Sequence, residues 1–121
     1  MMDRFNEMAR QFWAYGPQLI GALLVLGCAA VASAQDVAKG QAVFTAQKCS
    51  MCHAVAGKGN AKGPLDAVGT KLKADEIRAW IVDAPGMTAK TSAPRKPAMK
   101  SYTLPKEDLD ALVGYLASLK K

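Results

Sequence analysis

Cys49-Ser50-Met51-Cys52-His53 is the strongest single indication of fold and chemistry in this 121-residue sequence. Two cysteines with two residues between them are followed directly by a histidine, which is the pattern of covalent haem attachment. In that arrangement each cysteine sulfur bonds to a vinyl group of the haem, and the histidine becomes the proximal ligand of the iron. The motif therefore predicts one haem c bound through Cys49 and Cys52, with His53 on the iron.

Two other uses of paired cysteines agree less well with the sequence. A structural zinc site takes four nitrogen or sulfur ligands. His53 is the only histidine, however, and the third cysteine, Cys28, lies far upstream in an apolar run. A thioredoxin-like dithiol belongs in a βαβ context, and neither flank of the motif alternates like a strand. Haem attachment is the hypothesis that the flanking sequence favours.

The amino-terminal segment has the pattern of an export signal. An apolar run over residues 19–31 is followed by Ala32-Ser33-Ala34, the kind of small-residue stretch at which signal peptides are cut. Cleavage after Ala34 would divide the chain into a signal peptide, residues 1–34, and a mature domain, residues 35–121. The mature domain is then expected in the periplasm.

Other outcomes remain open for this segment. Residues 12–34 are long enough to span a bilayer, with two aromatic residues at interfacial positions, so the segment could be retained as a membrane anchor. Residues 25–28 loosely resemble a lipoprotein signal, which would place a lipid on Cys28. Met8 rather than Met1 could be the start, which would leave a shorter, positively charged leader. In each of these cases the haem domain is expected in the periplasm, free or tethered to the inner membrane.

The mature domain is too small to build a large core from its own side chains, so a bound macrocycle would have to supply part of it. Helical spacing of apolar residues predicts helices over residues 37–47, 74–84 and 105–119. Pro85 is expected to end the second helix, and residues 85–98 are expected to be irregular. No segment alternates like a strand.

Residues spread along the mature domain follow a recognisable order: Gly40, Phe44, Cys49-x-x-Cys52-His53, Gly63-Pro64-Leu65, Trp80, Met99, and a terminal helix with Leu112 and Tyr115. This order, over residues 37–119, resembles small bacterial class I cytochromes c. The resemblance implies an all-α cytochrome c fold, in which three main helices and loops surround one covalently bound haem after an N-terminal signal or anchor helix. It also implies that the first and last helices cross at Gly40, with Phe44 packed against Leu112 and Tyr115.

A methionine is the expected second axial ligand of the iron. The chain has no second histidine, and a thioether is a soft ligand that raises the reduction potential. Met51 lies inside the attachment loop, so Met87 and Met99 are the candidates beyond the amino-terminal segment. The resemblance favours Met99, which follows the irregular stretch and precedes the last helix, and leaves Met87 as the alternative.

Two further residues are assigned roles through the resemblance. The carbonyl of Pro64 is expected to accept a hydrogen bond from the second ring nitrogen of His53, which would fix the tautomer and orientation of the imidazole. The indole N–H of Trp80 could donate to a haem propionate. The alternative for Trp80 is a place in the core, because it lies at helical spacing from Ile77 and Ile81.

The formal net charge of +6 belongs to the mature domain, because two arginines and two acidic residues balance within residues 1–34. A basic ring around the exposed haem edge would steer an acidic redox partner to it. Nucleic acid is not an expected partner of an exported haem domain. The basic residues that flank the ligand-bearing segments are Lys48, Lys58, Lys62, Arg95, Lys96 and Lys100.

These features predict a periplasmic one-electron carrier, not an enzyme, whose haem cycles between Fe(III) and Fe(II) with His53 and Met99 as axial ligands. One alternative is a membrane-anchored haem subunit of a larger oxidase, reductase or dehydrogenase. Another is a peroxidase-like or ligand-binding haem protein, which would require that Met99 does not hold the iron.

Overall fold

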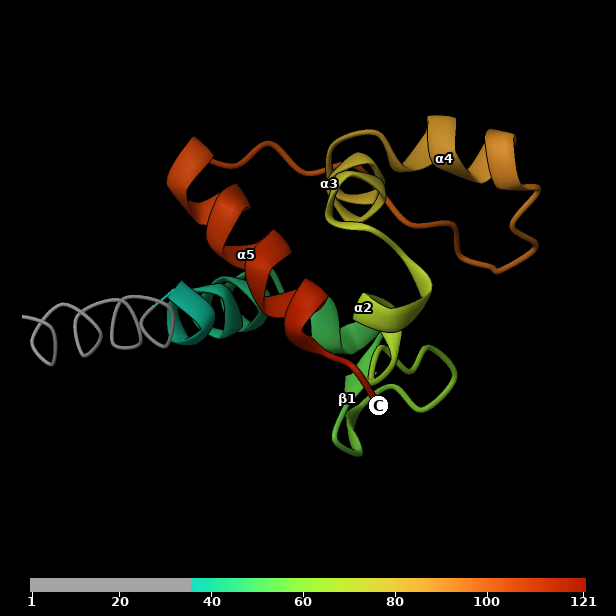
Figure 1. Ribbon diagram of the computed structural model, residues 1–121. Helices are drawn as coiled ribbons and strands as arrows, with labels where there is room; N and C mark the ends of the chain where they lie inside the picture. The colour runs from blue at the N-terminus through green and yellow to red at the C-terminus, as the bar shows by residue number, and fades with distance from the viewer. Residues whose placement is uncertain (1–35) are drawn as a thin grey trace, which may run out of the picture. The chain divides into compact units, whose positions relative to one another are not determined.

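The structure, a computed structural model, describes residues 36–121, which fold mainly into helices (Figure 1). The first helix that it describes covers residues 36–46. The 3₁₀ helix η1 (Cys49–Met51), the strands β1 (Ala54–Val55) and β2 (Lys58–Gly59), and the helices α2 (Val68–Lys71), α3 (Ala74–Val82), α4 (Ala84–Thr91) and α5 (Lys106–Ser118) follow. The expected all-α class is confirmed, because each strand holds only two residues.

The predictions for residues 1–34, namely a signal peptide, an anchor over 12–34 or a lipid on Cys28, lie outside the described residues. Within residues 36–121, no helix combines the length and the apolar character that crossing a bilayer requires. The described residues belong to one compact unit of the chain, Gln35–Lys121.

Acidic residues at their starts explain where α3 and α5 begin. Asp75 and Glu76 lie in the first turn of α3, as Glu107 and Asp108 do in α5, and carboxylates are favourable next to the positive end of the helix dipole. The Glu76 carboxylate also accepts a 2.8 Å hydrogen bond from the backbone N–H of Lys73, as in a capping box. The predicted helices over 74–84 and 105–119 are thus present with slightly shorter ends.

Pro85 begins a helix rather than ending one, so the prediction of an irregular stretch over 85–98 was wrong in its first half. The backbone leaves the helical region at Asp83, and α4 starts at the next residue with Pro85 in its first turn. A proline is well placed there, because its missing N–H would have had no partner in the helix. The Asp83 carboxylate accepts a 3.1 Å hydrogen bond from the backbone N–H of Gly86 and caps the new helix.

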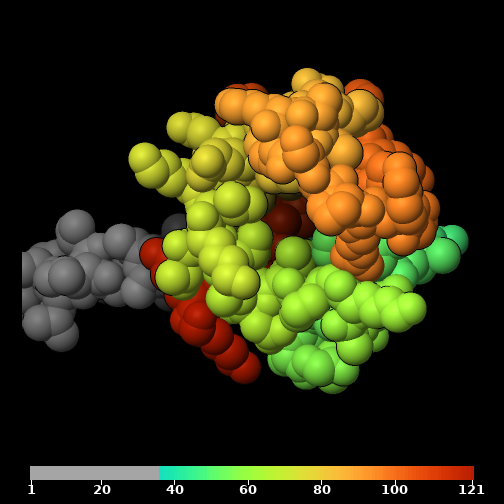
Figure 2. All heavy atoms as spheres, turned by 90° about the vertical axis from the view of Figure 1, so that its right-hand side faces the viewer, coloured from blue at the N-terminus to red at the C-terminus, as the bar shows by residue number. Residues whose placement is uncertain are grey.

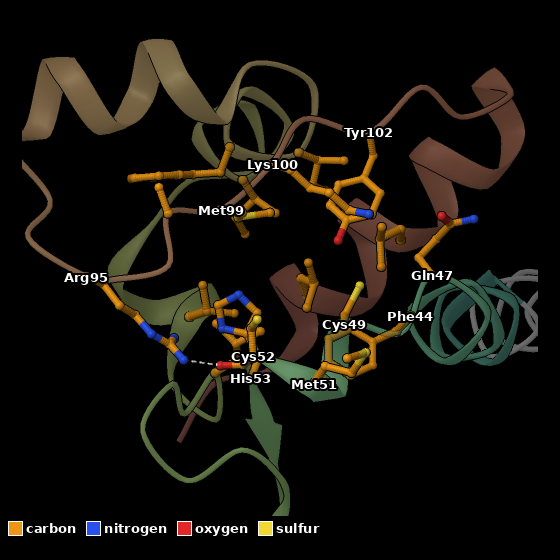
Figure 3. Close-up of a pocket in the computed structure, with 18 of the residues that line it drawn as sticks. Phe44, Gln47, Cys49, Met51, Cys52, His53, Arg95, Met99, Lys100 and Tyr102 are labelled. Atoms are coloured by element: carbon orange, nitrogen blue, oxygen red, sulfur yellow. Dashed lines mark hydrogen bonds between the residues drawn. The ribbon is translucent and has the colours of Figure 1, made fainter.

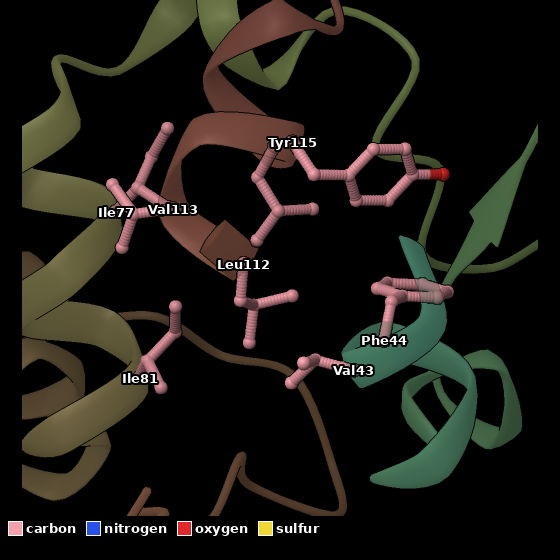
Figure 4. Close-up of a cluster of buried hydrophobic side chains, with 8 residues drawn as sticks. Val43, Phe44, Ile77, Ile81, Leu112, Val113 and Tyr115 are labelled. Atoms are coloured by element: carbon pink, nitrogen blue, oxygen red, sulfur yellow. The ribbon is translucent and has the colours of Figure 1, made fainter. Parts of the chain in front are cut away.

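The core lies where the first helix, α3 and α5 meet (Figure 4). Each of these helices contributes its apolar face, as the periodicity of the sequence predicts. The buried residues of the core cluster are Val43, Phe44, Ile77, Ile81, Leu112, Val113, Tyr115 and Leu116.

The crossing of the first helix with α5 depends on Gly40, which is buried. A Cβ at this position would stand closer than 3.0 Å to the backbone of Ala111 and to the Cβ of Tyr115. The Phe44 ring packs edge-on against the Tyr115 ring, with centroids 5.9 Å apart and planes at 67°. The close crossing and the aromatic contact that the resemblance implied are both confirmed.

One ion-pair network joins α3 to α5. The Asp110 carboxylate lies 2.5 Å from Arg78 Nη2 and 2.6 Å from Lys106 Nζ. The hydrogen bonds from Lys106 and Arg78 lower the pKa of Asp110. These pairs therefore act at neutral pH and are lost as the pH falls below the usual range of a carboxyl group. Their contribution is small, because the side chains are partly exposed.

The helix crossing yields a matched pair of glycine substitutions. We expect Gly40→Ala to destabilise the holoprotein by about 1–3 kcal/mol, because the added methyl overlaps the backbone of α5. Gly114→Ala in the same pair of helices should be neutral or stabilising by up to about 1 kcal/mol, because nothing lies within 4 Å of its Cβ position and alanine favours helix. Guanidinium unfolding measures both, and equal effects would contradict the close crossing.

Candidate functional site

The attachment motif forms a tight turn directly after the first helix. Lys48 adopts a left-handed conformation (φ 56°) that ends this helix and starts η1. The backbone N–H of His53 then donates a 2.9 Å hydrogen bond to the carbonyl of Cys49. This turn brings Cys49, Cys52 and His53 to the wall of one cavity (Figure 3).

The His53 ring is oriented by the carbonyl of Gly63, not by that of Pro64, so the prediction for Pro64 was wrong. Nδ1 of His53 lies 3.2 Å from the Gly63 oxygen. Ala54 pairs with Pro64 in a parallel bridge, donating to the carbonyl of Gly63 and accepting from Leu65. Since successive carbonyls of an extended segment point to opposite sides, this register turns the oxygen of Gly63 to the His53 side.

Burial lowers the pKa of His53, the hydrogen bond to Gly63 opposes this, and the positive charge of Arg95 adds to the lowering. The imidazole is therefore neutral at neutral pH. With Nδ1–H donating to the carbonyl of Gly63, Nε2 keeps its lone pair free for a metal. This is the tautomer that a proximal ligand needs.

A cavity of about 540 Å³ opens beside the motif, within the range of about 300–1,000 Å³ that is usual for ligand sites. Figure 2 shows the hollow on the molecular surface, with atoms of α5 at its base. Much of the wall is apolar and comes from the first helix, α2, α3 and α5 and the loop before α2. These apolar wall residues are Phe44, Leu65, Val68, Leu72, Ile77, Trp80, Ile81, Leu112 and Leu116.

Met99 lies on the wall of the cavity across the gap from His53 (Figure 3). Met87, the alternative, lies in α4 and is not among the residues that line the cavity. Met51 also lines the cavity but is 70% exposed, at its rim. The structure thus brings one methionine, Met99, to a position facing the imidazole.

Trp80 lines the cavity and is only partly buried. It is outside the buried core cluster that Ile77 and Ile81 join. Trp80 thus lies on the cavity wall and not in the core, and its hydrogen bond to a haem propionate stays a prediction.

The segment that carries Met99 is held at its carboxyl end by α3 and α4. The backbone N–H of Tyr102 donates a 2.8 Å hydrogen bond to the carbonyl of Ile81, and the N–H of Ala84 donates to Oγ of Ser101 at 3.2 Å. Sequence reasoning missed these anchors, as it missed Gly63, because each depends on contacts between distant segments. The only local indication of these anchors in the sequence is the pair of hydrogen-bonding residues Ser101 and Tyr102 shortly after Met99.

The charged residues of the cavity wall are all basic in the part of the chain that the structure describes. They are Lys48, Arg95 and Lys100, and no carboxylate joins them. The ammonium of Lys100 lies 5.2 Å from the centre of the Tyr102 ring. Burial raises the pKa of the Cys49 thiol. The other basic residues singled out from the sequence, Lys58, Lys62 and Lys96, do not line the cavity.

Comparison with known proteins identifies the family. Residues 37–120 match the family model for cytochrome c. The chain is also similar to cytochrome c oxidase subunit 2 of Alkalihalophilus pseudofirmus, with 33% identity over an alignment of 91 residues, which covers 68% of this chain and 25% of that protein. The chain thus spans about a quarter of the length of this relative. No solved structure matches the chain. The chain belongs to the cytochrome c family.

The residues of the cavity fit the cofactor of this family, a c-type haem bound covalently through Cys49 and Cys52. The two thiols and His53 share one wall, and the remaining surface is largely apolar, as a flat macrocycle requires. No cluster of three or more histidine, cysteine or acidic residues within residues 36–121 offers a different metal site.

Each cysteine should account for one thioether bond. We expect Cys49→Ser or Cys52→Ser to leave one vinyl group of the haem free, which moves the α band of the pyridine haemochrome to longer wavelength. The double variant should release its haem to acid acetone. Met51→Ser serves as the control, because it lies between the cysteines and contributes no bond. Haem that is freely extracted from the native protein would contradict covalent attachment.

Proposed function

We propose that this cytochrome c domain is a periplasmic one-electron carrier with His53 and Met99 as the axial ligands of its haem. Haem-based electron transfer follows from membership of the family. The observation that supports the finer assignment is the position of Met99 on the cavity wall, across from His53. The apolar run over 19–31 and the small residues up to Ala34 support the compartment.

The side chains around the cavity suit reversible electron transfer better than catalysis. The haem supplies an iron that takes up and releases one electron. The apolar wall keeps water away from it, and the bond from His53 to Gly63 holds the imidazole in one orientation. No carboxylate or second histidine lines the cavity in the described part of the chain, so the wall offers no acidic or imidazole group to move a proton.

Substitution of the two candidate methionines tests the axial ligand. We expect Met99→Ala to convert low-spin Fe(III) to a high-spin or ligand-exchanged form and to abolish the methionine-to-iron charge-transfer band. The reduction potential should fall, because a thioether stabilises Fe(II). Met87→Ala is the matched control and should leave the spectrum unchanged, since Met87 does not line the cavity. Native protein with high-spin iron would contradict the proposed carrier.

The proposed partner is an acidic redox protein that docks at the rim of the cavity. The rim carries Lys48, Lys100 and the exposed side chain of Met51. Positive charge around an apolar contact attracts an anionic surface over long range and lets it settle against the haem edge.

Small redox reagents of opposite charge test this surface directly. Oxidation of the Fe(II) protein by hexacyanoferrate(III) should slow several-fold as salt rises, because salt screens the attraction of the anion to the rim. Oxidation by the tris(phenanthroline)cobalt(III) cation should not slow. Lys48→Gln with Lys100→Gln should lower the rate with the anion, whereas Lys120→Gln, away from the cavity, should not. An equal effect of the Lys48/Lys100 double variant and the Lys120 variant on this rate would contradict docking at the basic rim.

A second candidate is a haem module of a larger terminal oxidase. The relative named as an oxidase subunit favours it, although this chain spans only about a quarter of that protein. The two candidates share the haem site and differ in what the domain is attached to. Purification of the native chain separates them, because a carrier is isolated alone and a module is isolated with its complex.

A further inference from the structure

Arg95 lines the cavity and bonds to the attachment motif. Its guanidinium Nη2 donates a hydrogen bond to the backbone carbonyl of Cys52, 43 residues earlier in the chain (Figure 3). Arg95 precedes Met99 by four residues in the segment between α4 and α5. The bond therefore joins the segment that carries the proposed distal ligand to the segment that carries the proximal ligand.

This segment has few other attachments. Its start is held by a 3.2 Å hydrogen bond from the N–H of Ala93 to Thr88, and its end by the bonds of Ser101 and Tyr102. Among the described residues, no other hydrogen bond ties residues 94–100 to the remainder of the domain. Met99 thus lies on a stretch of chain, residues 94–100, whose single hydrogen bond to the rest of the described domain comes from Arg95.

Because Gly63 has no side chain, the guanidinium of Arg95 can occupy the space beside its Cα. A Cβ on Gly63 would stand closer than 3.0 Å to both Arg95 Nη1 and the carbonyl oxygen of Cys52. The guanidinium thus lies against backbone on the proximal side, next to the glycine whose carbonyl orients His53. A planar guanidinium suits this place better than an ammonium, because it can present several donors in one plane.

We infer that Arg95 is a positioning residue that holds the Met99 segment closed over the haem and so limits how readily Met99 leaves the iron. The inference rests on the proposed axial ligation by Met99. An external ligand reaches the iron only when Met99 has moved away, so its apparent affinity scales with the fraction of open protein. Loss of the Arg95 bond raises that fraction.

Titration of the Fe(III) holoprotein with imidazole tests this inference, with loss of the methionine-to-iron charge-transfer band as the signal. We expect Arg95→Gln to bind imidazole about three- to tenfold more tightly than the native protein, as removal of one solvent-exposed hydrogen bond implies. Lys96→Gln is the matched control, because it removes the same charge from the neighbouring exposed residue. It should bind imidazole as the native protein does.

Arg95→Lys keeps the positive charge but replaces the planar guanidinium by an ammonium on a shorter side chain. Imidazole affinity above the native value in Arg95→Lys supports positioning by the guanidinium, and it does so even if Arg95→Gln yields no holoprotein. Native affinity in both Arg95→Lys and Arg95→Gln overturns the inference. Equal affinities in Arg95→Gln and Lys96→Gln also overturn it. A native protein without the charge-transfer band contradicts the proposed ligation itself, so the two failures are distinct.

Discussion

The fold depends on a flat apolar group fixed to Cys49 and Cys52, because the same side chains form the core and the wall of the cavity. Phe44, Ile77, Ile81, Leu112 and Leu116 belong to both. In a domain this small, the polypeptide buries too little apolar surface for high stability by itself. The haem completes the core, and the covalent bonds keep it there through every cycle of oxidation and reduction.

The helix crossing and the haem site are mechanically connected. Gly40 lets the first helix approach α5, and the same helix ends at residue 46, just before Lys48 leads into η1. The position of both cysteines is therefore set by a contact between the two ends of the domain. On the other side of the cavity, the bonds of Tyr102 and Ser101 to α3 and α4 set the position of the Met99 segment. A rigid frame around the iron suits electron transfer, since it limits rearrangement between the two redox states.

The sequence predicted what local patterns encode. Helical periodicity placed α3, α5 and the helix over 36–46 within a few residues, and the attachment motif named the cofactor of the family. Ligation of the iron by His53 stays a prediction. The sequence failed where two outcomes fit one pattern. Pro85 can end a helix or begin one, and the capping carboxylate of Asp83 decided in favour of α4.

The acceptor for His53 could not be predicted either. The choice between the carbonyls of Gly63 and Pro64 depends on the register of the bridge to Ala54, which is a contact between segments. Arg95 is a similar case, because its charge was evident and its bond to Cys52 was not. The sequence therefore indicated which side chains carry the chemistry, whereas the hydrogen-bond partners that orient those side chains depend on tertiary contacts.

The proposed electron transfer depends on axial ligation of one haem by His53 and Met99. Nuclear magnetic resonance of the diamagnetic Fe(II) holoprotein, with carbon-13 in the methionine methyl groups, tests it most directly, because the ring current of the haem shifts the methyl group of a bound methionine far upfield. Ligation by Met99 predicts one such methyl signal, absent from Met99→Ala and retained in Met87→Ala. A shifted signal that belongs to Met87, or no shifted signal in the native protein, would contradict it.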